Sequence, residues 1–207
     1  MAIRIFTLFA IVVAAITFIF GACGKILPSA CNQSFAYTIN AKVYPDKDTV
    51  SVGDTIFAEV NFPTTLTDSS SGEIAHLSGA SGVATDMGFV KLVSDSPIVL
   101  DDAVADFDFI LIAGKELKSP MPQRIKLYSF EESSGQFHFK LSIVAKDTGT
   151  FQFGLPPAPG VEEKNSNCPT FTLNYLLKNT TDQHYYLWPG GSGVTPQGAD
   201  YYFYVKP

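Results

Sequence analysis

The chain has 207 residues, of which 46% are hydrophobic and 13% aromatic, and its formal net charge is −6. This much apolar material is enough for a sizeable core, so the composition excludes an intrinsically disordered chain. Lysine and arginine are thinly scattered and form no basic patch, which excludes nucleic acid as an expected partner. The composition therefore predicts an acidic folded protein, with a single domain once any leader is removed.

The first 22 residues differ from the rest of the chain. Arg4 and the amino terminus supply positive charge, an uncharged apolar run extends from Ile5 to Ala22, and the run ends in the small residues Gly21 and Ala22. This order is typical of a secretory signal peptide, here residues 1–22. The alternative is a permanent membrane-spanning helix, because the run approaches the roughly 20 residues that cross a bilayer.

Phe20-Gly21-Ala22-Cys23 resembles the lipobox of bacterial lipoproteins, with Phe20 where the lipobox usually has leucine. The resemblance implies that Cys23 becomes the first mature residue and carries lipid, including palmitate. Each buried methylene contributes about 0.8 kcal/mol, so several acyl chains hold a protein stably on a bilayer. We therefore expect residues 23–34 to be a lipid-attachment site and short tether. The expected location is a bacterial cell envelope, with the outer membrane favoured and the body in the periplasm or outside the cell.

If Cys23 carries lipid, Cys31 and Cys168 remain of the three cysteines. An oxidising compartment favours even pairing, so these two predict a disulfide. Such a bond would close a long loop and stabilise the fold by about 4 to 5 kcal/mol in the chain-entropy model. The alternative is two unpaired thiols. The spacing of cysteine and histidine matches no zinc motif, and we expect no cofactor.

Two long segments, 55–62 and 136–145, have an apolar residue at every second position. This period of two is typical of half-buried strands. Further strands are expected at 35–44, 87–93, 107–113, 124–130, 150–155, 170–177, 184–188 and 201–206. No part of the mature chain shows a helical stripe, so the predicted fold class is all-β, an antiparallel sandwich or barrel.

Two short segments favour the sandwich. The segment from Tyr44 to Asp54 ends in Val-Ser-Val-Gly-Asp and resembles the opening of bacterial immunoglobulin-like domains, where such a turn leads into the second strand. The segment Asp147-Thr-Gly-Thr-Phe-Gln-Phe153 resembles their Asp-x-Gly-x-Tyr-x-Cys corner, with phenylalanine in place of both tyrosine and cysteine. The resemblance implies an immunoglobulin-like β-sandwich over residues 35–207, with a turn at Gly149. With its leader, the chain looks like exported lipoproteins of the Bacteroidota, a likeness that implies a location and no activity.

The candidate ligand-binding residues are Tyr185, Tyr186 and Trp188, because such side chains stack on sugar faces or anchor protein interfaces. The alternative is that Tyr186 and Trp188, two positions apart on one face of a strand, fill the core. The polar segment 63–86 is expected to be a surface loop, either a plain excursion or a ligand contact, and 156–169 an irregular connection.

Metal and catalytic motifs are weak. Four aspartates lack the spacing of a calcium loop and favour a solvated acidic turn: Asp101, Asp102, Asp106 and Asp108. The sequences around Ser81 and Ser192 lack the final glycine of a nucleophile elbow. We therefore expect no enzyme but a binding or structural module that contacts an envelope protein or an extracellular ligand. The alternatives are a carbohydrate-binding accessory that uses the aromatic residues near 184–188, and a hydrolase with an unrecognised site.

Overall fold

The computed structural model describes residues 35–68, 71–95, 98–164, 171–177, 183–189 and 198–207. Their secondary structure is almost entirely β-strand, as the alternating sequence predicts. Two short 3-10 helices also occur within these residues, η2 (Val104–Asp106) and η3 (Tyr185–Leu187). None of the described helices has the length and hydrophobicity needed to cross a bilayer.

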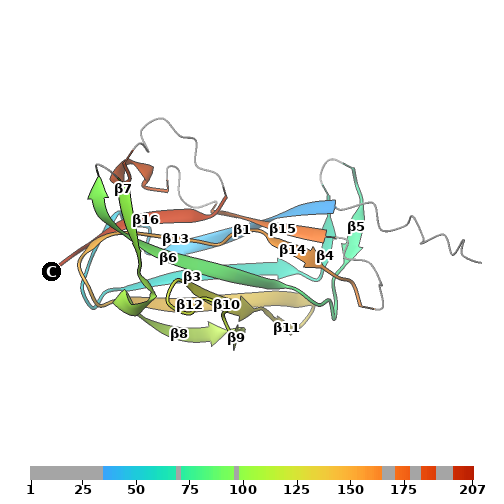
Figure 1. Ribbon diagram of the computed structural model, residues 1–207. Helices are drawn as coiled ribbons and strands as arrows, with labels where there is room; N and C mark the ends of the chain where they lie inside the picture. The colour runs from blue at the N-terminus through green and yellow to red at the C-terminus, as the bar shows by residue number, and fades with distance from the viewer. Residues whose placement is uncertain (1–34, 69–70, 96–97, 165–170, 178–182, 190–197) are drawn as a thin grey trace, which may run out of the picture. The chain divides into compact units, whose positions relative to one another are not determined.

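Most strands belong to two large sheets (Figure 1). The first sheet has the order β11 (Glu131–Ser133), β12 (Gln136–Ala145), β3 (Thr55–Pro63), β1 (Phe35–Tyr44), β15 (Phe171–Leu177) and β14 (Ala158–Val161), with β8 (Phe107–Ala113) also paired to β12. The second has the order β2 (Thr49–Ser51), β16 (Asp200–Lys206), β13 (Gly149–Gly154), β6 (Ala84–Asp95), β10 (Ile125–Ser129) and β9 (Lys115–Leu117), with β7 (Ile98–Asp102) also paired to β6. A small third sheet pairs β4 (Thr65–Thr67) with β5 (Ile74–His76).

The centre of each sheet has the strand order of an immunoglobulin-type sandwich. The set β8, β12, β3 and β1 corresponds to its four-stranded sheet, and the set β16, β13 and β6 to its three-stranded sheet. Extra strands widen both sheets, and β15 joins the first one parallel to β1 while β2 joins the second parallel to β16. The predicted all-β sandwich is confirmed, with sheets that contain parallel as well as antiparallel pairs.

The two turns that carried the resemblance also form. Gly53 has φ +88°, which favours glycine, and the Ser51 N–H donates to Asp54 Oδ2 at 2.8 Å just before β3 begins. Gly149 has φ +140° and opens β13, on which Phe151 and Phe153 are both fully buried. These turns set the first residue of each strand, and so decide which side chains of the strand face inward.

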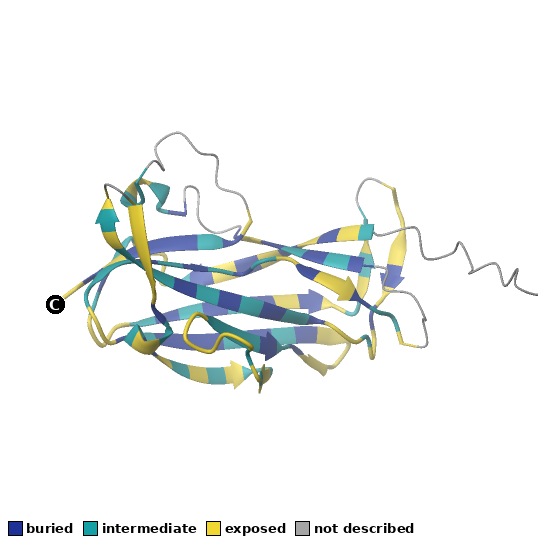
Figure 2. Cartoon of the chain, in the orientation of Figure 1, coloured by how far each residue is buried: buried dark blue, intermediate teal, exposed yellow. Residues whose placement is uncertain are grey.

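The core is a layer of aromatic and aliphatic side chains between the two sheets, and buried and exposed residues alternate along the long strands (Figure 2). The second sheet supplies Phe153 to this core. The ring centroid of Phe153 lies 5.7 Å from that of Phe89 and 6.0 Å from that of Phe203. Phe107 comes from the first sheet and meets Phe151 at 4.9 Å in an edge-to-face contact. These contacts fix the orientation of β6, β13 and β16, so the residues between the buried ones must face outward.

Three sequence-based expectations need correction. The segment 63–86 is no plain loop, because it contains the β4–β5 hairpin and buries Ala75 and Leu77 completely. The connection 156–169 includes β14 in its described part. The strand expected at 184–188 is the 3-10 helix η3, and the backbone before it is left-handed at Gln183 and His184, which is incompatible with a strand.

Candidate binding site

The outer face of the second sheet carries the candidate binding site. The strand registers place Asp200 opposite Gly154, and Gly154 opposite Gly88, in one row across β16, β13 and β6. On each strand, one residue directly adjacent to this row points into the core and is fully buried: Tyr201, Phe153 and Phe89. Side chains alternate across a sheet, so the row Asp200, Gly154, Gly88 faces away from the core.

This row is the floor of a hollow that we call the trough, whose volume is about 290 Å³. Its sides carry the polar residues Asp86, Gln152 and Arg124 and the apolar residues Val90 and Leu100. A second cavity of about 340 Å³ shares Asp86 and Pro156 with the trough and continues along residues 156–159. Together the two cavities have the size of a small-molecule site.

Two glycines side by side in the middle of a sheet call for a physical reason. A glycine in a strand interior costs about 0.5 to 1 kcal/mol relative to alanine, and it often marks a place where another group approaches the backbone. At Gly154 that group is part of the protein, because a Cβ there would lie 2.4 Å from Asp200 Oδ1. At Gly88 no described atom lies within 4 Å of the position of a Cβ. Within the described part of the chain, the floor of the trough is therefore bare backbone at Gly88, with open space above it.

The Asp200 carboxylate is partly buried in the trough. Burial raises its pKa above the ordinary value, and a hydrogen bond from the Gln152 amide opposes that rise. A carboxylate that has lost much of its water and lies over a glycine is a strong hydrogen-bond acceptor for a bound molecule. Asp200 and Asp86 are therefore the natural acceptors of the site.

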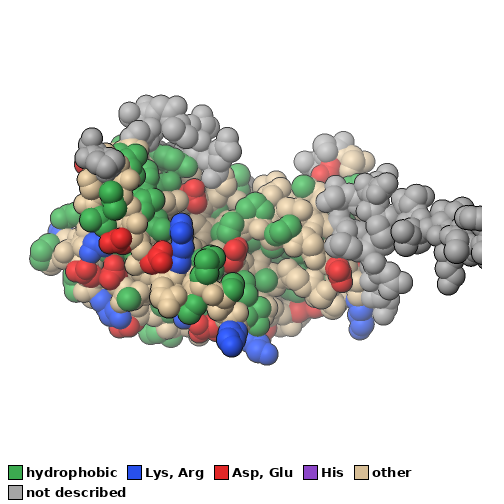
Figure 3. All heavy atoms as spheres, in the orientation of Figure 1, with side chains coloured by type: hydrophobic (Ala, Val, Ile, Leu, Met, Phe, Trp, Pro, Cys, Tyr) green, Lys and Arg blue, Asp and Glu red, His purple; other side chains and the backbone are tan. Residues whose placement is uncertain are grey.

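The charges around the trough are mixed, with acid in excess. Arg124 Nε lies 3.7 Å from Asp102 Oδ1, so part of its positive charge is matched within the protein. Figure 3 views the molecule from the side of β6 and shows charged side chains of both signs dispersed over this surface, with hydrophobic side chains gathered near β7. The described lining of the site holds no cluster of cations that would attract an anionic ligand.

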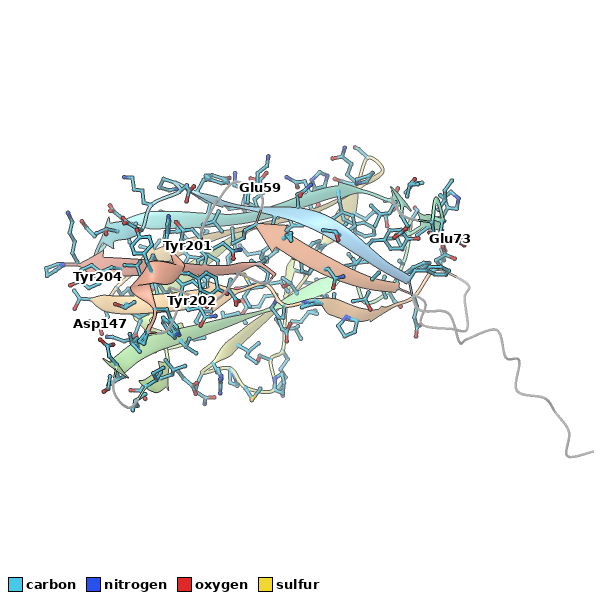
Figure 4. The ribbon with its side chains drawn as sticks, turned by 90° about the horizontal axis from the view of Figure 1, so that it is seen from above. Glu59, Glu73, Asp147, Tyr201, Tyr202 and Tyr204 are labelled. Carbon is cyan, nitrogen blue, oxygen red and sulfur yellow. The ribbon has the colours of Figure 1, made fainter. Side chains whose placement is uncertain are left out.

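An aromatic corner borders the trough next to Gln152. Tyr202 lies opposite Gln152 on the outer face of β16 and yet is only 4% exposed, because other rings cover it. The centroids of Tyr185 and Trp188 lie 4.6 and 5.2 Å from that of Tyr202. Figure 4 labels Tyr201 and Tyr202 on opposite sides of β16, the first toward the core and the second toward this corner. Two of the three predicted aromatic residues therefore lie together beside the trough.

Tyr186 is the exception. Its side chain remains 57% exposed, and its hydroxyl donates to Asp48 Oδ2. Its neighbour His184 contacts the same turn through Nε2, 3.4 Å from Asp46 Oδ1, and its Nδ1 lies 3.1 Å from the Tyr202 carbonyl oxygen. Its exposure argues against the core-filling interpretation, and its hydroxyl attaches η3 to the turn before β2, while the ligand-binding role of Tyr186 stays a prediction.

The backbone leading into η3 is strained. Gln183 and His184 have φ values of +51° and +56°, a region that costs non-glycine residues about 1 to 2 kcal/mol each. Gln183 is also buried, and its Oε1 has no hydrogen-bond partner among the described residues, although its Nε2 donates to the Gly198 carbonyl oxygen at 3.1 Å. Strain and an unsatisfied polar atom are features that functional sites often retain.

A separate hollow of about 360 Å³ lies on the opposite face of the sandwich, on the outside of the first sheet. Its polar groups already bond to one another. Glu59 accepts from the Tyr44 hydroxyl and from Asn61 Nδ2, both at 2.6 Å, and Lys140 Nζ lies 3.6 Å away. The Tyr44 hydrogen bond contributes most to lowering the pKa of Glu59. A ligand here would have to replace existing bonds, so the trough is the better candidate.

Other predicted residues fall in three groups. Cys23, Cys31 and Cys168 lie outside the described residues, as do the predicted signal peptide, the tether and Ser192. Asp101 and Asp102 lie on β7, and Asp108 Oδ1 lies 2.9 Å from Lys146 Nζ. The described residues hold no group of side chains that could bind a metal ion. Ser81 bridges to Glu162 through its backbone.

The sequence pattern did not identify the trough residues, although it contains one signal for them. Gly88 interrupts the strand expected at 87–93, and a glycine inside a strand pattern indicates a bulge or a close approach. Its pairing with Gly154 depends on a long-range register that the sequence does not reveal.

Comparison with known proteins adds no further constraint. No protein-family model matches the chain, and no match was found among curated proteins or solved structures. The site is therefore interpreted from its own geometry.

We expect Asp200→Asn to stabilise the protein at neutral pH, because it removes a partly buried charge and keeps an acceptor for Gln152. Since the folded-state pKa of Asp200 is raised, the wild type loses this penalty as the pH falls through that value toward about 4. Urea unfolding at a series of pH values measures the difference.

The exposed carboxylate of Asp102 is the matched control, and Asp102→Asn is expected to change stability by less than about 0.5 kcal/mol. A difference between Asp200→Asn and wild type that does not shrink on acidification would contradict the assigned environment of Asp200.

Proposed function

We propose that this protein is a lipid-anchored, non-enzymatic binding module of a bacterial cell envelope. The leader and Cys23 support the anchor, and the compact β-sandwich supports a body that works outside the cytoplasm. The binding role rests chiefly on one observation, the space above the backbone at Gly88 that no atom of the described residues occupies, with acceptor side chains beside it. The partner or ligand would enter the trough and contact the outer face of the second sheet.

The proposal includes a disulfide between Cys31 and Cys168. β1 and β15 are parallel neighbours, and their register begins with Phe35 opposite Phe171. Cys31 precedes Phe35 by four residues and Cys168 precedes Phe171 by three, so both cysteines come just before strands that start side by side.

Intact mass spectrometry of the membrane-extracted protein tests the anchor and the disulfide together. The expected species begins at Cys23, carries the mass of its acyl chains, and gains the mass of two hydrogens on reduction. Cys23→Ser is expected to lose the lipid and leave the leader attached. A full-length chain without lipid, recovered from the cytoplasm, would refute the anchor, and two thiols that alkylate without prior reduction would refute the disulfide.

The binding role is tested by adding labelled, lipid-free mature protein to isolated cell envelopes of its own bacterium. We expect saturable binding that Gly88→Val weakens by about tenfold, because the valine side chain fills the trough. The φ of Gly88 lies outside the left-handed region and valine suits strands, so the variant is expected to fold normally.

The control is Asn40→Ala, an exposed position on β1 in the other sheet, for which unchanged binding is expected. Equal binding by wild type and Gly88→Val would exclude the trough as the contact site.

A further inference from the structure

We propose that the ligand of the trough is a neutral oligosaccharide, an inference that rests on the proposed binding function and names its ligand class. The trough combines three properties that few other ligands satisfy at once. It has bare backbone at Gly88, side groups that mainly accept hydrogen bonds, and an adjoining cavity that prolongs it.

The floor accommodates a flat ring. Gly88 and Gly154 are paired across β6 and β13, and Val90 and Leu100 line the trough beside them. Leu100 is 43% exposed. One face of a pyranose ring carries mostly C–H groups, which can rest on exposed backbone and aliphatic side chains without losing hydrogen bonds. The absence of a Cβ at Gly88 lets such a ring approach the sheet closely.

The polar groups select for hydroxyl donors. Asp200 lies at one end of the floor and Asp86 lines both the trough and its extension, so carboxylate oxygens are available on two sides of the space. Sugar hydroxyls donate to carboxylates in charge-assisted hydrogen bonds, and the Gln152 amide is placed beside Asp200. An anionic ligand would be repelled by the two aspartates, while the nearest cation, Arg124, already lies 3.7 Å from Asp102.

The extension indicates more than one sugar unit. The second cavity begins at Asp86 and Pro156 and follows residues 156–159, where three of the four residues are proline. Proline rings are rigid and lose little entropy when a ligand covers them. A chain of linked rings can therefore occupy the trough and its extension together, whereas a single ring would fill only one cavity.

The aromatic corner provides a built-in reporter. Trp188 is the only tryptophan of the chain, and it packs on Tyr202, the direct cross-strand neighbour of Gln152. A ligand that bonds to Asp200 and Gln152 would change the surroundings of this corner. Intrinsic fluorescence then reports occupancy of this site and not of the hollow on the other sheet.

The test is a titration of the mature protein with a panel of short neutral oligosaccharides built from glucose, xylose, mannose or galactose, followed by Trp188 fluorescence and calorimetry. We expect saturable binding of at least one member, with longer oligomers binding more tightly than the monosaccharide. Gly88→Val and Asp200→Asn should each weaken that binding by about tenfold, while Asn40→Ala should leave it unchanged.

The outcomes separate the ligand class from the binding function. If no oligosaccharide binds but Gly88→Val still abolishes binding to cell envelopes, the trough binds a different ligand and the oligosaccharide inference is overturned alone. If a polyamine such as spermidine binds in place of the sugars, the two aspartates recognise a cation and the inference is likewise overturned. If Gly88→Val changes neither sugar nor envelope binding, the trough is excluded as the contact site, and the proposed binding role of the trough fails as well.

Discussion

The packing of phenylalanine side chains between the two sheets is the constraint on which the rest of the structure depends. Phe89, Phe153 and Phe203 come from three adjacent strands and all point inward. Because side chains alternate along a strand, turning these rings into the core places Gly88, Gly154 and their neighbours on the outside. A slip of one residue in any of the three strands would bury the trough residues and expose the rings. The geometry of the candidate site is therefore a consequence of the core.

Features that reduce stability are concentrated around this site. Two glycines interrupt the centre of the second sheet, Asp200 is a partly buried carboxylate, and Gln183 and His184 have left-handed backbone. Each costs free energy, and the hydrophobic core offsets the sum. A protein selected only for a stable sandwich would gain from a β-branched residue at Gly88, where nothing in the described structure blocks a side chain. Binding offers a physical reason for keeping the glycine.

Much of the fold could be predicted from the sequence because strand periodicity is local. The alternation in 55–62 and 136–145 appears as β3 and β12, and the glycine turns at Gly53 and Gly149 open the strands that they were expected to open. The site was harder to predict because it depends on register. Gly88 and Gly154 become neighbours only when β6 and β13 pair, and no local pattern specifies that pairing. The 3-10 turn at Tyr185–Leu187 escaped prediction for a related reason, since contacts with Asp48 and Tyr202 override the strand propensity of its aromatic residues.

The most direct measurement of the central claim is a map of backbone amide chemical shifts of the isotope-labelled mature protein as a neutral oligosaccharide is added. If the trough is the binding site, the amides of Gly88, Gly154 and Asp200 will shift together with the Trp188 indole N–H, and those of Glu59 and Asn61 on the opposite face will not. Shifts confined to Glu59, Asn61 and Lys140, with the glycine amides unmoved at saturation, would contradict the account.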